Sequence, residues 1–121
     1  MNWFSIKSNF PWLKMNYSSS VKQIMEESIE LPQIIFKHST RCSISSMALN
    51  RFEREWDKNI GAKLYYLDLI EFRSLSNEIA ELLTVEHQSP QVILLMNREV
   101  KYSASHNGIE VHKILDLIKN S

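Results

Sequence analysis

The sequence contains one cysteine, Cys42, in a setting that suits thiol chemistry. It follows the polar stretch Lys37–Arg41 and opens the run Cys42-Ser43-Ile44-Ser45, where a helical hydrophobic period begins. Free N–H groups and the positive end of the dipole at a helix N-terminus favour a thiolate over a thiol by about 0.3–2 kcal/mol. The thiolate is the reactive form of cysteine, so the spacing predicts that Cys42 is a nucleophile in thiol–disulfide exchange.

Three neighbours of the cysteine could favour the thiolate further. Arg41 and Lys37 add positive charge, and Ser45 can offer its hydroxyl to the sulfur across one helical turn. Taken singly, each residue also has a simpler interpretation. Lone cysteines are commonly small apolar fillers, lysines and arginines are commonly solvated surface charges, and serines near a helix start are commonly caps.

A second candidate site is Ser89-Pro90, directly before an apolar run. Proline lacks an N–H, so at the start of a strand it usually marks an edge of the hydrogen-bonded ladder. A cis Ser-Pro bond is the functional alternative. Because only about 5–6% of such bonds are cis in folded proteins, these residues by themselves favour trans.

The elements that must position these residues follow from the hydrophobic pattern. We expect strands at residues 2–6, 34–36, 63–68, 91–96 and 99–104, and helices at 20–29, 42–59, 74–84 and after Asn107-Gly108. The order β-α-β-α-β-α-β-β-α predicts an α/β fold with a central mixed sheet and helices on both faces. Strands separated by helices should be parallel and the terminal hairpin antiparallel. The absence of repeats and long linkers predicts a single domain over residues 1–121.

Helix faces and caps give finer expectations. The helix at 42–59 should bury one face, made of Ile44, Met47, Ala48, Phe52 and Trp56. Caps are expected from Ser20 with Gln23, from Ser74 or Ser76, and from Asn107 with Glu110.

Composition excludes several classes of function. Of the 121 residues, 14 are Lys or Arg and 14 are Asp or Glu, so the basic footprint expected of a nucleic-acid binder is missing. The longest apolar run, Val92–Met96, is far shorter than the roughly 20 residues of a membrane-spanning helix. One cysteine excludes an intramolecular disulfide and a cysteine-rich metal site. Without a signal-peptide pattern, we expect the protein in the cytoplasm.

Together, the element order, the Cys-x-x-Ser at a helix start, Ser-Pro before the hairpin and Asn-Gly before the last helix resemble the thioredoxin superfamily. More narrowly, the stretches Ile35–Ser45, Arg51-Phe52-Glu53 and Ser89-Pro90-Gln91 are similar to the YtxJ family, the monothiol bacilliredoxins called BrxC. This resemblance implies a thioredoxin-like fold and removal of bacillithiol from protein mixed disulfides, with Cys42 as the nucleophile. Bacillithiol is then a co-substrate, no cofactor is bound, and bacillithiol or another redoxin regenerates Cys42. The expected partners are bacillithiolated client proteins, and the protein is expected to be a monomer.

By the same resemblance, Pro90 should be cis and should place the Ser89 backbone beside Cys42 to pair with an extended substrate. Five residues should shape the bacillithiol pocket: Thr40, Arg41, Ser43, Ile44 and Ser45. Two of them depart from the family pattern, because Ser43 stands where proline is frequent and Arg41 where threonine is usual. Ser43 keeps an N–H that could reach the thiolate, and Arg41 could pair with a malate carboxylate of bacillithiol.

Other functions have less support. The four histidines, His38, His87, His106 and His112, include no i, i+4 pair on one helix, so no metal site is expected, and no Gly-x-Ser-x-Gly elbow for hydrolysis occurs. A monothiol glutaredoxin is the nearest alternative, although its Cys-Gly-Phe-Ser does not match Ser43 and Ile44. A non-catalytic adaptor is another alternative, with a surface formed by Trp3, Phe10, Trp12 and Tyr17.

Overall fold

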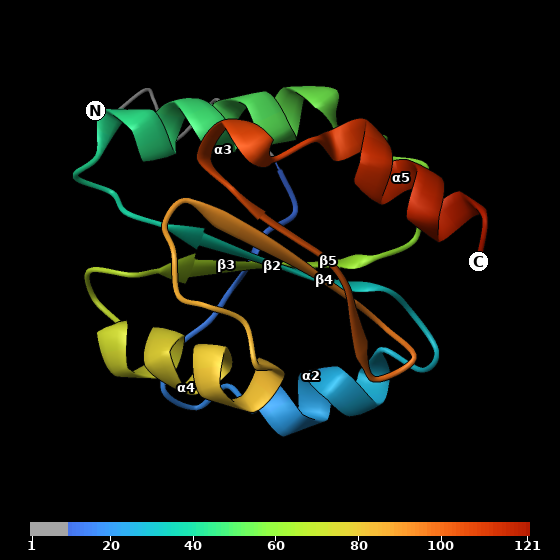
Figure 1. Ribbon diagram of the computed structural model, residues 1–121, viewed down its shortest axis with the longest axis horizontal. Coiled ribbons are helices and arrows are strands. Elements are labelled where there is room, and N and C mark those ends of the chain that lie inside the picture. Colours follow the sequence, from blue (N-terminus) through green and yellow to red (C-terminus); the bar gives the residue numbers. More distant parts are fainter. Residues whose placement is uncertain (1–9) are drawn as a thin grey trace.

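The computed structural model describes residues 10–121, in which a five-stranded sheet lies between two layers of helices (Figure 1). The strands are β1 (Leu13–Lys14), β2 (Gln33–His38), β3 (Lys63–Asp68), β4 (Gln91–Met96) and β5 (Glu99–Ser105). The helices are α2 (Val21–Glu27), α3 (Ser43–Glu55), α4 (Arg73–Leu83), the short 3₁₀ turn η1 (His106–Gly108) and α5 (Val111–Lys119). The predicted α/β class with a mixed sheet and helices on both faces is confirmed.

The first strand differs from the prediction. The strand expected at residues 2–6 lies outside the described residues, and β1 instead occupies a segment that was predicted to be loop. It pairs in parallel with β3, Leu13 opposite Tyr65. A two-residue strand is too short to show an alternating pattern, so the sequence gives no periodic signal for it. Trp12 and Met15 hold it in place by packing into the core on either side.

The direction of β4 also differs from the prediction. The strand order is β1-β3-β2-β4-β5, and β1, β3 and β2 are parallel. Strand β4 follows a helix, α4, and was therefore predicted to be parallel, but it is antiparallel to its neighbour β2. Residues 84–90 return the chain to the end of the sheet where β2 finishes, so β4 starts there and runs back. Gln91 therefore lies opposite Lys37. This brings the segment before β4 to the end of the sheet that leads into α3.

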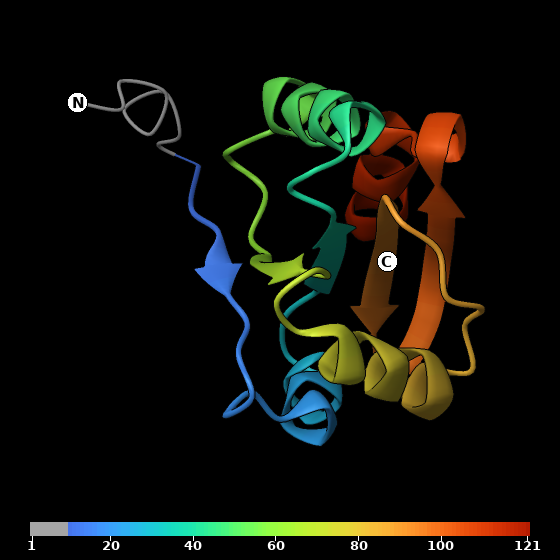
Figure 2. The ribbon, with the colours of Figure 1, turned by 90° about the vertical axis from the view of Figure 1, so that its left-hand side faces the viewer.

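Each face of the sheet has its own core. Helices α3 and α5 cover one face, and α2 and α4 cover the other (Figures 1 and 2). The core under α3 is rich in rings, with Phe52 within 5.5 Å of both Phe36 and Trp56, centroid to centroid. The core under α2 and α4 is almost entirely aliphatic, with Ile35, Ile79 and others buried.

Several local expectations for the helices need correction. Helix α3 ends at Glu55, not near residue 59, because Trp56 is extended and stacks on Phe52. Its buried face is made by Ala48 and Phe52, whereas Ile44 and Met47 are 57% and 70% exposed. Ser45 and Ala48 in the same turns are buried, so only part of the apolar stripe faces the sheet.

Only one of the predicted caps is formed by a side chain. The Ser20 hydroxyl accepts the Gln23 N–H at 3.2 Å at the start of α2. Helix α4 begins after Phe72, and Ser76 is buried within it. Helix α5 begins after Glu110, whose side chain makes no cap hydrogen bond.

Candidate active site

Cys42 occupies the N-cap position of α3, directly before the first helical residue. Its backbone is extended, with φ −109° and ψ 120°, and its side chain makes no cap hydrogen bond. The residue is partly exposed, and the first turn of α3 contains no acidic residue. The N–H groups of that turn are therefore left to the sulfur and to solvent.

A tight turn leads from β2 to the cysteine. The Cys42 N–H donates to the Ser39 carbonyl at 3.1 Å, and the Cys42 carbonyl accepts the Ser46 N–H at 3.0 Å. At the start of the same turn, the Ser39 N–H donates to the Ser45 hydroxyl at 3.0 Å. The position of the sulfur is therefore set by backbone hydrogen bonds on both sides of it.

Ser45 does not have the role that was predicted from its spacing. Its side chain is fully buried, and its hydroxyl lies 2.7 Å from Nδ1 of His38 in addition to accepting the Ser39 N–H. Ser45 therefore contacts the turn and the end of β2, and no hydrogen bond joins it to the Cys42 sulfur in the described residues. The i, i+3 spacing identified the right face of the helix but could not show the competing partner from β2.

Lys37 also differs from both of its predicted roles. It belongs to β2 and is completely buried on the face opposite Cys42, with its ammonium 3.2 Å from the Ser76 carbonyl and 3.3 Å from Nδ1 of His87. Burial lowers the pKa of Lys37 to about 8. Because successive side chains of a strand point to opposite faces, Lys37 is neither a surface charge nor a cation beside the thiol.

The Ser89–Pro90 bond is cis, as the resemblance implied and against the base rate for such bonds. By the pairing of β4 with β2, this segment lies at the end of the sheet from which the chain enters α3. The Pro90 carbonyl accepts the His106 N–H at 3.1 Å, which ties it to η1. The structure thus gathers the cysteine turn, the cis-proline segment and η1 at one end of the sheet (Figure 1).

A small groove beside the cysteine contains residues that the sequence did not indicate. It has a volume of about 190 Å³ and is lined by Ile44, Met47, Ala48, Arg51, His106 and Asn107. The Arg51 guanidinium fixes its wall, because it donates to the carbonyls of His106 and Ile109 at 3.4 and 3.2 Å. Only Ile44 of this group was predicted as a site residue. Met47 and Ala48 were predicted to lie on the buried face of the helix, and His106 and Asn107 were missed because η1 lies more than 50 residues from α3 in the sequence.

The remaining predicted pocket residues form an exposed rim around Cys42. Thr40, Arg41 and Ser43 are all exposed and flank the sulfur in sequence. Ser89 is half-buried, and its hydroxyl oxygen is buried without a hydrogen-bond partner among the described residues. The rim therefore offers one cation and several hydrogen-bonding groups to a ligand attached to Cys42.

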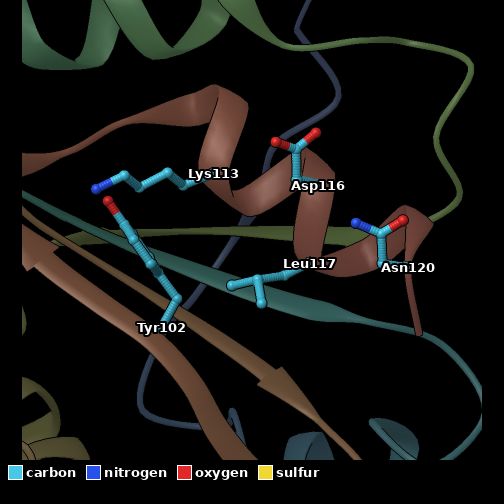
Figure 3. Close-up of a pocket in the computed structure, with 5 residues that line it drawn as sticks. All are labelled: Tyr102, Lys113, Asp116, Leu117 and Asn120. Carbon is cyan, nitrogen blue, oxygen red and sulfur yellow. The ribbon is translucent and has the colours of Figure 1, made fainter.

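A larger cavity, of about 370 Å³, lies away from the cysteine between β5 and α5. It is lined by Tyr102, Lys113, Asp116, Leu117 and Asn120 (Figure 3). The Tyr102 hydroxyl donates to the Gly108 carbonyl and accepts the Glu110 N–H, both at 3.0 Å. Tyr102 therefore anchors the start of α5, and no cysteine lines the cavity.

Residues 10–121 contain neither a metal-binding cluster nor a membrane-spanning helix. Within residues 10–121, no group of three or more His, Cys, Asp or Glu side chains is placed to hold a metal ion. In the same part of the chain, no helix is long and apolar enough to cross a bilayer.

Of the aromatic residues suggested for an adaptor surface, Phe10 and Trp12 pack against the ring-rich core, Tyr17 is exposed, and Trp3 lies outside the described residues.

Known proteins share this arrangement. The sequence model of a family described as monothiol bacilliredoxin BrxC matches residues 13–114. A solved structure described as a candidate oxidoreductase with a thioredoxin fold is 28% identical, with a TM-score of 0.70 over 94% of this chain and 96% of that chain. Thioredoxin f from spinach chloroplast (16% identity, TM-score 0.63, 88% of this chain and 83% of that chain) is also similar. Thioredoxin O2 from Arabidopsis thaliana is 15% identical, with a TM-score of 0.65 over 91% of this chain and 93% of that chain. These similarities confirm the predicted thioredoxin-like fold.

Proposed function

Because the chain belongs to the family of BrxC monothiol bacilliredoxins, we propose that it removes bacillithiol from proteins by thiol–disulfide exchange at Cys42. The observation that carries this proposal is the position of Cys42, partly exposed at the N-cap of α3 with no side-chain cap hydrogen bond. A second cysteine is missing from the sequence, so the resolving thiol must come from another molecule. This requirement fits a monothiol reaction in which bacillithiol is co-substrate and no cofactor is bound.

The proposed reaction has two exchange steps. The Cys42 thiolate attacks the bacillithiol sulfur of a protein–bacillithiol disulfide; that disulfide breaks, and the client leaves as a thiolate that takes up a proton. Cys42 is then joined to bacillithiol by a new disulfide. The thiolate of a second bacillithiol, or of another redoxin, attacks the bacillithiol sulfur of this disulfide, which forms bacillithiol disulfide or a redoxin–bacillithiol disulfide and releases Cys42 as the thiolate.

The residues around the sulfur suit this ligand chemistry. The exposed rim of Thr40, Arg41 and Ser43 can bind the polar glucosamine and malate parts of bacillithiol, with the Arg41 guanidinium set to pair with a carboxylate. Ile44 gives an apolar edge, and Ser45 supports the pocket from beneath. The Ser89 backbone, next to the cis bond, can pair with an extended client segment.

The setting of this activity is part of the same proposal. We place the protein in the cytoplasm as a monomer that acts on bacillithiolated client proteins. The balance of 14 basic and 14 acidic residues gives no reason to invoke a nucleic-acid partner.

The direct test follows the transferred group by mass. Reduced protein is mixed with a bacillithiolated test protein, the reaction is quenched with acid at several times, and both intact masses are measured. We expect one bacillithiol to appear on Cys42 as it disappears from the test protein, and Cys42→Ala to show no transfer. If wild-type protein and Cys42→Ala release bacillithiol at the same rate, the proposal is wrong.

A specificity arm uses Arg41→Ala in the same assay. If the guanidinium pairs with a malate carboxylate, this variant should lose about three- to tenfold in rate on a bacillithiolated protein but little on a neutral mixed disulfide such as a 2-mercaptoethanol adduct. Equal losses on both substrates would remove the carboxylate role from Arg41 while leaving the role of Cys42 intact.

A further inference from the structure

His38 is a buried titratable group that the exchange reaction, as written above, does not use. It is the last residue of β2 and is only 4% exposed. Its Nδ1 lies 2.7 Å from the Ser45 hydroxyl, and its ring lies 5.6 Å from that of Tyr66, centroid to centroid. The ring thus lies on the same face of the sheet as α3.

The hydrogen bonds of Ser45 can be satisfied by a neutral His38. The Ser45 hydroxyl already accepts the Ser39 N–H, so its own hydrogen is free to be donated. A neutral His38 with its proton on Nε2 presents Nδ1 as the acceptor for that hydrogen. In this arrangement the Ser45 hydroxyl and Nδ1 of His38 both have partners.

A chain of contacts then leads from His38 to the sulfur. His38 holds the Ser45 hydroxyl, Ser45 holds the first residue of the turn at Ser39, and the Ser39 carbonyl accepts the N–H of Cys42. Each link is a hydrogen bond between groups that are buried or partly buried. A rotation of the Ser45 side chain therefore changes the support of the residue that carries the nucleophile.

We propose that neutral His38 is a positioning residue for Cys42 and acts through the hydroxyl of Ser45. This inference rests on the proposed use of Cys42 as a nucleophile. When His38 is protonated, its Nδ1–H donates to the Ser45 oxygen and competes there with the Ser39 N–H, which weakens the support of the turn that carries Cys42.

The groups around His38 set the balance between its two forms. Burial lowers the pKa of His38, whereas the carboxylate of Asp68, its neighbour on β3, and a hydrogen bond with the Ser45 backbone act in the opposite direction. Tyr66 on β3 remains neutral, because burial raises its pKa to about 12. From α3, His38 is faced by Ser45, with the Cys42 thiol at the start of that helix. The neutral ring is therefore the form favoured near neutral pH.

The test measures alkylation of Cys42 by iodoacetamide, a small neutral probe that requires neither bacillithiol nor a client. We expect Ser45→Ala and His38→Phe to slow the reaction about tenfold at neutral pH, because the turn loses its support. His38→Asn keeps an acceptor near the Nδ1 position but does not titrate. It should react within about threefold of wild type, and its rate should fall less steeply than that of wild type as the pH is lowered, because residue 38 can be protonated only in wild type.

Ser76→Ala is the matched control, since Ser76 is a buried serine hydrogen-bonded to a histidine, His87, on the opposite face. It should react at the wild-type rate, and circular dichroism should show folded protein for each variant compared. If His38→Phe does not fold, Ser45→Ala and His38→Asn decide the result. The inference is overturned if Ser45→Ala reacts like wild type, if the rate of His38→Asn falls as steeply at low pH as that of wild type, or if Ser76→Ala is slowed equally. If the alkylation rates follow this pattern but no bacillithiol is transferred, the proposed function is overturned and the positioning role of His38 is not.

Discussion

Strand β2 ends in two adjacent polar residues, and the sheet sends one of them to each face. Lys37 enters the face covered by α2 and α4, where it contacts the Ser76 carbonyl and His87. His38 enters the face covered by α3, where it contacts Ser45. Both side chains are buried, and each meets a serine of the helix above it.

The difference between them lies in what the contacts lead to. Those of His38 continue through Ser45 and Ser39 to the turn that carries Cys42, whereas those of Lys37 end at α4 and the segment after it. Burial of a polar side chain is therefore not by itself a sign of catalysis. Such a side chain takes part in the reaction only where its contacts lead to the reactive sulfur. Three predictions compare the two faces further.

The largest expected effect concerns the two cores. Phe52→Ala should lower the free energy of unfolding by roughly 3–5 kcal/mol, because Phe52 is fully buried and its ring meets those of Phe10, Trp12, Phe36 and Trp56. Ile79→Ala makes the corresponding truncation in the aliphatic core. It should lower the free energy of unfolding by a smaller amount than Phe52→Ala, within the range of about 2–5 kcal/mol. Urea denaturation of both variants measures the difference. A larger loss of unfolding free energy for Ile79→Ala would contradict the expectation that truncation costs more in the ring-rich core under α3.

The second effect is a pH dependence that belongs to Lys37. Its pKa is lowered by burial from 10.5 to about 8, so between these values the unfolded chain binds more protons than the folded one. The free energy of unfolding should therefore rise with pH in this window. The contribution of Lys37 is about 2 kcal/mol between about pH 7.5 and pH 9.5.

Lys37→Met should remove this rise, and subtracting its stability curve from that of wild type isolates the contribution. The measurement stays below pH 10 because burial also raises the pKa of Tyr66, to about 12, and this has the opposite sign at higher pH. The same variant should keep the wild-type rate of Cys42 alkylation, since the Lys37 ammonium contacts Ser76 and His87 and, among residues 10–121, makes no hydrogen bond to the turn. Parallel stability curves for wild type and variant would show that the ammonium is solvated.

The smallest effect compares two helix starts. Ser20 before α2 and Cys42 before α3 have nearly the same backbone, with φ and ψ of −106° and 114° against −109° and 120°, yet only Ser20 makes a side-chain cap hydrogen bond. Ser20→Ala should cost about 1 kcal/mol of stability. Cys42→Ser should instead add about 0.5–1 kcal/mol while abolishing exchange.

Thermal unfolding of the two variants and wild type provides this comparison. An increase for Cys42→Ser would show that the helix gives up a cap in order to present a thiol. A loss of stability in Cys42→Ser would show that the sulfur packs better than a hydroxyl caps.

The sequence predicted those parts of the protein that depend on near neighbours along the chain. The apolar run and alternating pattern of residues 91–104 define the hairpin, and Asn97-Arg98 form its turn, both with positive φ. The helical period after Cys42 places Ala48 and Phe52 in the core and the thiol at a helix start. Hydrophobic period and turn chemistry are local, so they can be read before the chain is folded.

Only the tertiary structure decided which polar groups meet. It extended β2 to include Lys37 and His38, paired Ser45 with His38 in place of the sulfur, and brought η1 against α3 to form the groove beside Cys42. These contacts join residues that local pattern does not link, and each depends on strand pairing, on the direction of β4 and on which face a side chain enters. A periodic pattern carries no information about such partners, because they are chosen when the sheet and its two layers of helices assemble.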